Sequence, residues 1–174
     1  PGQHRAFRAG NVLAQMRRVA DWQLDNFERQ SVEGSRYPDS HAYWSWVNAA
    51  MYVGLAGMTD LATEAKYTTF LQTVGRKTRW KPGRNIFFAD DLCVGQFYAM
   101  FYERYRDSAM IRPTVEALDR VMAAPDTASL NYYAKGSHSR WCWCDAIFMG
   151  PTVYARVGRA TGDRRYYDYL DREF

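Results

Sequence analysis

Residues 140–151 hold the side chains best suited to chemistry, with two tryptophans, two cysteines and one carboxylate between Trp141 and Asp145. An acid among large rings loses hydration, which raises its pKa and lets it hold a proton near neutral pH. Flat rings beside a carboxyl group also suit a sugar-binding cleft. Asp145 is therefore a candidate proton donor, and Trp141 and Trp143 are candidate substrate-stacking residues. The simpler alternative is that Asp145 caps the helix that follows it.

Two earlier segments carry similar residue types ahead of an apolar run. Trp44 and Trp46 are further stacking candidates, and Asn48 is a candidate donor to a sugar hydroxyl. Asp90 is the candidate second carboxylate, and Asp91 is the near alternative and a candidate substrate-binding residue. The structural alternatives are core tryptophans and acids that cap the next helix.

The spacing of apolar residues predicts helices throughout, because they recur at three- and four-residue steps and no alternating run is convincing. The expected helices cover roughly 5–29, 43–57, 60–75, 94–102, 107–124, 146–158 and 163–174. The second, fourth and sixth are apolar almost all round, which is typical of buried helices, whereas the others are amphipathic. The sequence therefore predicts an all-α protein.

A unit of about 50 residues recurs along the chain: a polar or aromatic segment, a buried helix, a turn and an outer helix. Such a period is typical of stacked α-hairpins. If the hairpins curve into a ring, the N-termini of the buried helices meet on one face, where helix dipoles favour negative charge. The three segments around Trp46, Asp90 and Asp145 would then line one cleft.

Composition narrows the function classes. The chain has 174 residues, enough for one domain, with 16% aromatic residues and a net charge of +4 that mildly favours an acidic partner. The basic residues are scattered, so nucleic acid ranks below an acidic sugar. No apolar run approaches the ~20 residues that span a bilayer. Cys93, Cys142 and Cys144 lack the spacing of a structural zinc site and are expected to be free thiols.

The segment Trp143–Pro151, followed by Thr161-Gly162-Asp163 and Tyr166, resembles the unsaturated rhamnogalacturonyl hydrolases of glycoside hydrolase family 105. These are related to the unsaturated glucuronyl hydrolases of family 88. Residues 44–50 and 90–96 also fall where that family has cleft segments. The resemblance runs from about Val19 to the end of the chain. It implies an (α/α)6 barrel of twelve helices, of which residues 1–174 would form roughly the N-terminal half of a single domain. The family's downstream cleft histidine and arginine have no counterpart here.

The resemblance also implies a reaction. Enzymes of this kind act on unsaturated uronyl oligosaccharides released by polysaccharide lyases, such as those of pectin rhamnogalacturonan. Asp145 would protonate C4 of the C4=C5 enol ether and then activate water to attack C5, with Asp90 as the second carboxylate. No metal or organic cofactor is implied, and the expected partner is an acidic unsaturated oligosaccharide.

Two alternatives stay open at this point. One is another carbohydrate-active enzyme on the same ring, an epimerase or an inverting glycosidase, the latter with carboxyl groups ~6.5–9.5 Å apart. The other is a non-catalytic helical-repeat module that binds sugar on its concave aromatic face. Such a module would tolerate Asp145→Asn with little change in binding.

Overall fold

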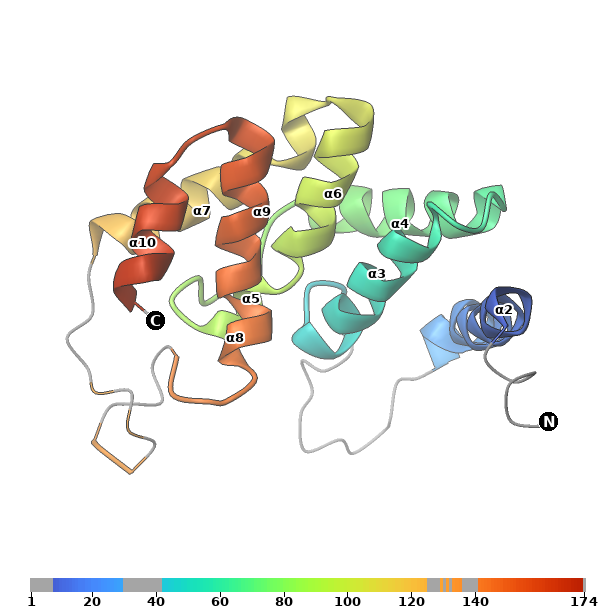
Figure 1. Cartoon of the computed structure of the whole chain (residues 1–174), viewed down its shortest axis with the longest axis horizontal. Helices are drawn as coiled ribbons and strands as arrows, with labels where there is room; N and C mark the ends of the chain where they lie inside the picture. Colours follow the sequence, from blue (N-terminus) through green and yellow to red (C-terminus); the bar gives the residue numbers. More distant parts are fainter. Residues whose placement is uncertain are drawn as a thin grey trace.

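The computed structural model describes residues 8–29, 42–124, 129, 131, 133–135 and 141–173, and this part of the chain contains helices and no strand. The fold is therefore all-α, as the sequence predicts (Figure 1). Its α-helices are α2 (Ala9–Asn26), α3 (Trp46–Met58), α4 (Ala65–Thr78), α5 (Ala89–Leu92), α6 (Gly95–Tyr105), α7 (Arg112–Ala123), α8 (Ala146–Met149), α9 (Pro151–Thr161) and α10 (Arg165–Glu173). Short 3-10 helices cover Phe27–Arg29 (η1) and Ser108–Met110 (η3).

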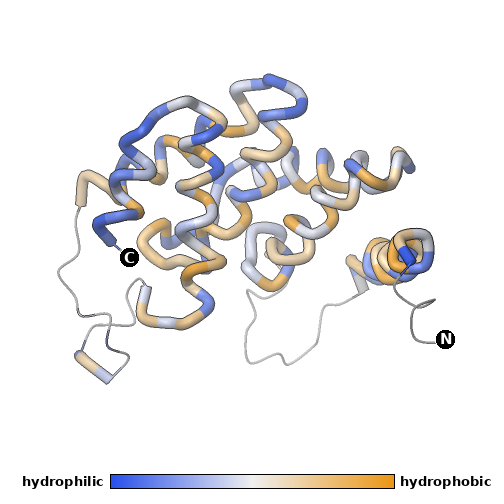
Figure 2. The backbone as a smooth tube through the Cα atoms, viewed as in Figure 1, coloured by the Kyte–Doolittle hydropathy of each residue, from blue (hydrophilic) through white to orange (hydrophobic). Residues whose placement is uncertain are grey.

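The apolar helices form the inner layer. Helix α6 packs against α3 on one side and α9 on the other, and the amphipathic α4 and α10 pack on α3 and α9. Nearly the whole first half of α6 is buried, whereas α10 buries only Tyr166 and Tyr169. The turns that follow α6 and α9 are hydrophilic (Figure 2). Inner helices with outer helices on one side are the arrangement of part of an (α/α)6 toroid.

Hydrogen bonds between outer helices repeat along the chain. The Tyr67 hydroxyl on α4 donates to Asp21 on α2 at 2.8 Å, and the Tyr166 hydroxyl on α10 donates to Asp119 on α7 at 3.0 Å. The partners are 46 and 47 residues apart. Each bond therefore links an outer helix to the preceding outer helix, at close to the spacing that the sequence repeat predicts.

A short helix lies at the start of two of the inner helices. Helix α5 precedes α6, which is the expected fourth helix, and the expected sixth helix is divided into α8 and α9. The break between α8 and α9 lies at Gly150, before Pro151, which has no N–H to continue a helix. A Cβ atom on Gly150 would lie 2.2 Å from the Trp141 ring, so the chain approaches this buried tryptophan too closely for any side chain. Helices α6 and α9 are thus each preceded by a single helical turn, whereas α3 is continuous.

Two predicted helix starts differ from the structure. Helix α4 begins at Ala65 rather than near residue 60, because Asp60 forms an ion pair with Arg104 and the Thr59 hydroxyl donates to the Ala56 carbonyl. Asp107 caps η3 by accepting from the Ala109 N–H at 2.9 Å, so α7 starts later. In the described part of the chain, no helix is long and apolar enough to cross a membrane.

Candidate active site

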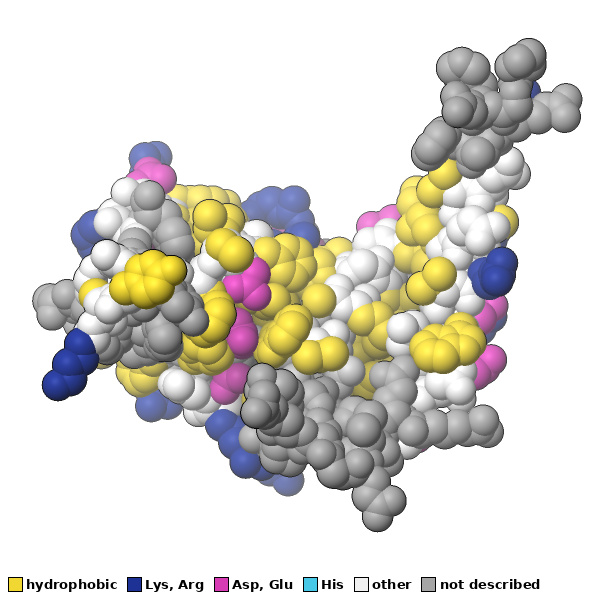
Figure 3. Space-filling view, turned by 90° about the horizontal axis from the view of Figure 1, so that it is seen from below, with side chains coloured by type: hydrophobic (Ala, Val, Ile, Leu, Met, Phe, Trp, Pro, Cys, Tyr) yellow, Lys and Arg dark blue, Asp and Glu magenta, His cyan; other side chains and the backbone are white. Residues whose placement is uncertain are grey.

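A pocket of about 690 Å³ lies where the N-terminal ends of α3, α5 and α8 meet. The described residues that line it are Trp44, Ser45, Trp46, Val47, Arg84, Asn85, Phe88, Asp90, Asp91, Trp143 and Asp145. Figure 3 looks onto this end of the molecule and shows acidic side chains among hydrophobic ones. The three segments singled out in the sequence therefore contribute to one pocket.

The pocket includes most of the predicted site residues but not Asn48 or Trp141. Asn48 is buried, and its side-chain amide donates to the Ala42 carbonyl at 3.0 Å. The Trp141 ring is buried beneath Gly150 and contacts Tyr154 edge-on. Neither side chain lines the pocket, and the predicted stacking residues that do line it are Trp44, Trp46 and Trp143.

The two candidate carboxylates differ in burial, and the order is the reverse of that expected. Asp145 is exposed, and although it is the N-cap residue of α8 its side chain makes no capping hydrogen bond, whereas Asp90 is half-buried. Burial, with repulsion from Asp145 and Asp91, raises the pKa of Asp90 to about 6. The expected screening of Asp145 by tryptophan rings fails because Trp141 lies in the core and Trp143 remains 43% exposed. Asp90 therefore holds its proton to a higher pH than an exposed aspartate does.

Asp91 has a different environment from its neighbour. Its side chain accepts a hydrogen bond from the Asn85 N–H at 2.6 Å, and its carbonyl accepts one from the Gly83 N–H at 2.6 Å. A Cβ atom on Gly83 would lie 2.4 Å from the Asp91 carboxyl carbon, so this approach requires glycine. The N-cap of α5 is Phe88, so neither Asp90 nor Asp91 caps the helix. Asp91 instead holds the loop that precedes α5 against the pocket.

Gln96, which sequence reasoning did not select as a site residue, connects two of the pocket-forming segments. It is 1% exposed, and its side-chain amide donates to the Phe148 carbonyl at 2.7 Å. This bond joins the first turn of α6 to α8. Asp90 lies in α5, just before α6, and Asp145 lies just before α8, so the bond links the two segments that carry the carboxylates. Its signal in the sequence is a single amide within an otherwise apolar run. We therefore regard Gln96 as a residue that sets the relative position of the two carboxylates.

Aromatic rings form the walls of the pocket. Trp46 and Trp143 are each 43% exposed, which leaves ring surface open for a ligand. The Arg84 guanidinium lies over the Trp44 ring, 5.7 Å from its centroid. The sequence analysis did not select Arg84, because a single arginine in a loop gives no distinctive pattern. Among its described lining residues the pocket thus combines ring faces, three carboxylates and one cation.

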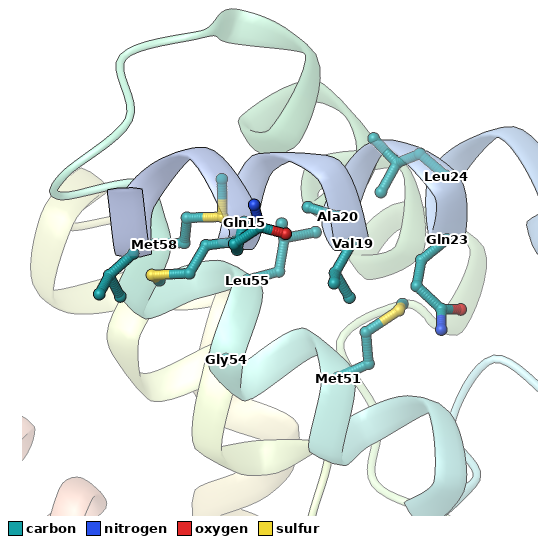
Figure 4. A pocket seen from close by; sticks show the side chains of 11 residues that line it. Gln15, Val19, Ala20, Gln23, Leu24, Met51, Gly54, Leu55 and Met58 are labelled. Atoms are coloured by element: carbon teal, nitrogen blue, oxygen red, sulfur yellow. The ribbon is translucent and has the colours of Figure 1, made fainter. Parts of the chain in front are cut away.

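A second pocket, of about 530 Å³, lies between α2 and α3 (Figure 4). Its described lining is Val12, Gln15, Met16, Val19, Ala20, Gln23, Leu24, Met51, Gly54, Leu55 and Met58. None of these side chains can donate or accept a proton near neutral pH. Nor does any group of three His, Cys, Asp or Glu side chains in the described ranges lie where it could hold a metal ion. Proton-transfer chemistry is therefore best placed in the first pocket.

The chain is similar in sequence to one family model and to two named proteins. The family model described as Glycosyl Hydrolase Family 88 matches residues 15–174. A protein from Alteromonas sp. (strain LOR), named unsaturated 3S-rhamnoglycuronyl hydrolase, is 28% identical over 173 residues, covering 90% of this chain. A protein of the same name from Formosa agariphila is 22% identical over 158 residues, covering 84% of this chain. The chain spans 41% of the length of each relative. These matches confirm the resemblance seen in the sequence, with family 88 as the matched model.

Proposed function

Because the chain belongs to Glycosyl Hydrolase Family 88, we propose that its pocket hydrolyses unsaturated uronyl oligosaccharides released by polysaccharide lyases. The observation that carries this proposal is the meeting of Asp90 and Asp145 in one aromatic-walled pocket. A half-buried carboxyl group with a raised pKa beside an exposed carboxyl group is suited to acid–base catalysis. The names of both relatives, unsaturated 3S-rhamnoglycuronyl hydrolase, agree with such a substrate.

The reaction would begin with protonation of the C4=C5 enol ether. Asp145, exposed in the pocket, delivers the proton to C4, and positive charge develops on C5 and the ring oxygen. Water then adds to C5 and gives up a proton to the Asp145 carboxylate. The resulting hemiketal opens and releases the rest of the oligosaccharide. One residue acts as acid and then as base, so the proton balance closes within a turnover.

Asp90 would stabilise the charge that Asp145 acquires during the reaction. Burial, with repulsion from Asp145 and Asp91, raises the pKa of Asp90 to about 6, so this residue stays neutral to a higher pH than an exposed aspartate does. Once Asp145 has given up its proton to the substrate, its new negative charge faces Asp90 and is stabilised when that residue is protonated.

The tryptophans would bind the sugar rings. The open faces of Trp46 and Trp143 offer apolar surface to pyranose rings, and Trp44 lies beneath Arg84 at the pocket wall. Stacking of this kind orients a sugar without contacting its reacting atoms. Which sugar follows the unsaturated uronyl residue, a rhamnose of the pectin type or another, is decided by the part of the pocket beyond these rings.

The test compares Asp145→Asn with the wild type in the full-length protein. Unsaturated uronyl-rhamnose disaccharide is added, and loss of the ultraviolet absorbance of the enol ether is followed over time. Asp171→Asn, an exposed acid on α10 away from the pocket, is the matched control. We expect decay with the wild type and the control, and loss of turnover by at least ~10³-fold in Asp145→Asn with helical circular dichroism retained. No decay with the folded wild type on pectin- or glycosaminoglycan-derived disaccharides would overturn the proposal.

A further inference from the structure

The pocket presents an electrostatic problem for an acidic ligand. Asp90, Asp91 and Asp145 all line it, and like charges at short range repel. Arg84 is the single cationic side chain among the described lining residues. An acidic sugar that enters this pocket therefore has one counter-charge available on the described wall.

Arg84 is free to supply that charge. It is exposed, and no carboxylate in the described part of the chain forms an ion pair with it. Asp91, a pocket-lining acid that contacts the loop of Arg84, accepts a hydrogen bond from the Asn85 N–H at 2.6 Å. The guanidinium thus keeps its donors for a ligand, although it lies within a strongly acidic pocket.

The position of Arg84 is fixed from two sides. Its guanidinium lies over the Trp44 ring at 5.7 Å, within the range of a cation–π contact. Its backbone lies between Gly83 and Asn85, which are both hydrogen-bonded to Asp91. Because the loop is held at both flanking residues, less side-chain freedom is lost when the guanidinium binds an oxyanion.

We infer that Arg84 binds an oxyanion of the substrate and so selects acidic over neutral oligosaccharides. The inference rests on the proposed function, which it deepens by naming a specificity-determining residue. A planar guanidinium can donate two parallel hydrogen bonds to a carboxylate or to a sulfate ester, the two oxyanions that acidic polysaccharides carry. Fixing that group would hold the sugar in one orientation against Trp46 and Trp143.

The experiment uses the full-length protein and the variants Arg84→Gln and Arg84→Lys. Arg120→Gln, at an exposed position on α7 outside the pocket, is the control with the same change in net charge. The substrates are the unsaturated uronyl-rhamnose disaccharide, its O-sulfated form and its uronyl methyl ester. Turnover is followed by enol-ether absorbance, and binding by quenching of tryptophan fluorescence with the same sugars.

The pattern of substrates affected identifies the oxyanion. Carboxylate binding predicts that Arg84→Gln lowers kcat/KM about 10- to 100-fold on both acids, mainly through KM, and changes the methyl ester little. Sulfate binding predicts the loss only on the O-sulfated form. In either case Arg84→Lys falls between Arg84→Gln and wild type, because the charge remains and the planar fork is lost. Equal loss on every sugar, ester included, or no loss on any, would overturn the inference.

The binding measurement separates this inference from the proposed function. If Arg84→Gln turns over the acidic sugars as fast as the wild type does, Arg84 has no role in binding them and the hydrolase proposal stays intact. A second outcome is that the wild type binds the acidic sugars without turnover and Arg84→Gln binds them more weakly. That result would overturn the hydrolase proposal and support the oxyanion site. A wild type that neither binds nor turns over any of the acids would overturn both.

Discussion

The Asp91 side chain accepts a hydrogen bond from the Asn85 N–H at 2.6 Å, whereas its neighbour Asp90 has its pKa raised by burial and by Asp145. Two adjacent acids in one short helix therefore have different environments. Asp91 holds the loop that precedes α5, whereas Asp90 interacts electrostatically with Asp145. This difference decides which of them is the better candidate for the second carboxylate of the reaction.

We expect Asp91→Ala to act mainly on stability. Removing the acceptor loses the hydrogen bond from the exposed Asn85 N–H, at a cost of about 0.5–1.5 kcal/mol in the free energy of unfolding. The pH dependence of turnover should move little, because Asp91 is the smallest of the three causes of the raised Asp90 pKa. Chemical denaturation and a pH–rate profile check the two expectations. An unchanged stability with a displaced profile would assign the second carboxylate to Asp91.

Asp90→Asn should change stability in a pH-dependent way. The folded-state pKa of Asp90 is raised from 3.8 to about 6, so the folded protein binds the proton more tightly than the unfolded chain. Stability from this group is therefore present at low pH and is lost as pH rises through about 6. At pH 7 the amide avoids a half-buried charge, and we expect Asp90→Asn to be more stable than wild type by about 1–2 kcal/mol.

Denaturation at pH 4 and at pH 7 measures this effect. The stability gain of Asp90→Asn over wild type should shrink markedly at the lower pH, where wild-type Asp90 is itself mostly protonated. Asp171→Asn, which changes an exposed acid, serves as the control and should show no such trend. A gain that is constant between the two pH values would contradict the assignment of the raised pKa to Asp90. Turnover of Asp90→Asn should fall even where its stability rises.

Helix type, helix order and the meeting of three segments could be predicted from the sequence, because apolar periodicity and the 50-residue repeat report directly on burial. The roles of Trp141 and Asn48 could not. Neither side chain lines the pocket: Trp141 packs against the close approach at Gly150, and the Asn48 amide donates to the Ala42 carbonyl. Sequence spacing does not carry either contact.

The relative burial of Asp90 and Asp145 was also beyond the sequence. A carboxylate flanked by tryptophans has the same local sequence whether the rings cover it or point away. The raised pKa of Asp90 arises from packing around α5 and from a charge 55 positions later in the chain, at Asp145. Only the three-dimensional arrangement brings these groups together.

The repeated bonds between outer helices predict two matched variants. Tyr67→Phe and Tyr166→Phe each remove one hydroxyl that donates to a carboxylate, at Asp21 and Asp119 respectively. We expect each to lower the free energy of unfolding by about 1–2 kcal/mol, and by similar amounts, because the two contacts are equivalent in the repeat. Tyr105→Phe, at a 39% exposed ring, is the control and should change stability by less than ~0.5 kcal/mol. Thermal unfolding by circular dichroism compares all three. A large effect from only one of the two would contradict the equivalence.

The close contact between Gly150 and Trp141, just before α9, predicts that Gly150→Ala lowers the stability of the protein, whereas a Gly→Ala change inside α3 does not. In Gly150→Ala the added Cβ would meet the Trp141 ring at 2.2 Å, so the ring or the α8–α9 segment must move. Overpacking of this kind costs about 1–3 kcal/mol, and the displacement would disturb α8, whose first residue follows Asp145.

Gly54→Ala is the matched control, because a Cβ atom there meets nothing within 4 Å and the residue lies inside α3. Alanine has the higher helix propensity, so Gly54→Ala should stabilise the protein by about 0.5–1 kcal/mol. Thermal unfolding gives the sign of both effects, and enol-ether turnover reports whether Asp145 has moved. Loss of turnover in Gly150→Ala beyond its loss of folded protein would show that the Trp141 contact positions the carboxylate. Equal stability of the two variants would contradict the close packing at Gly150.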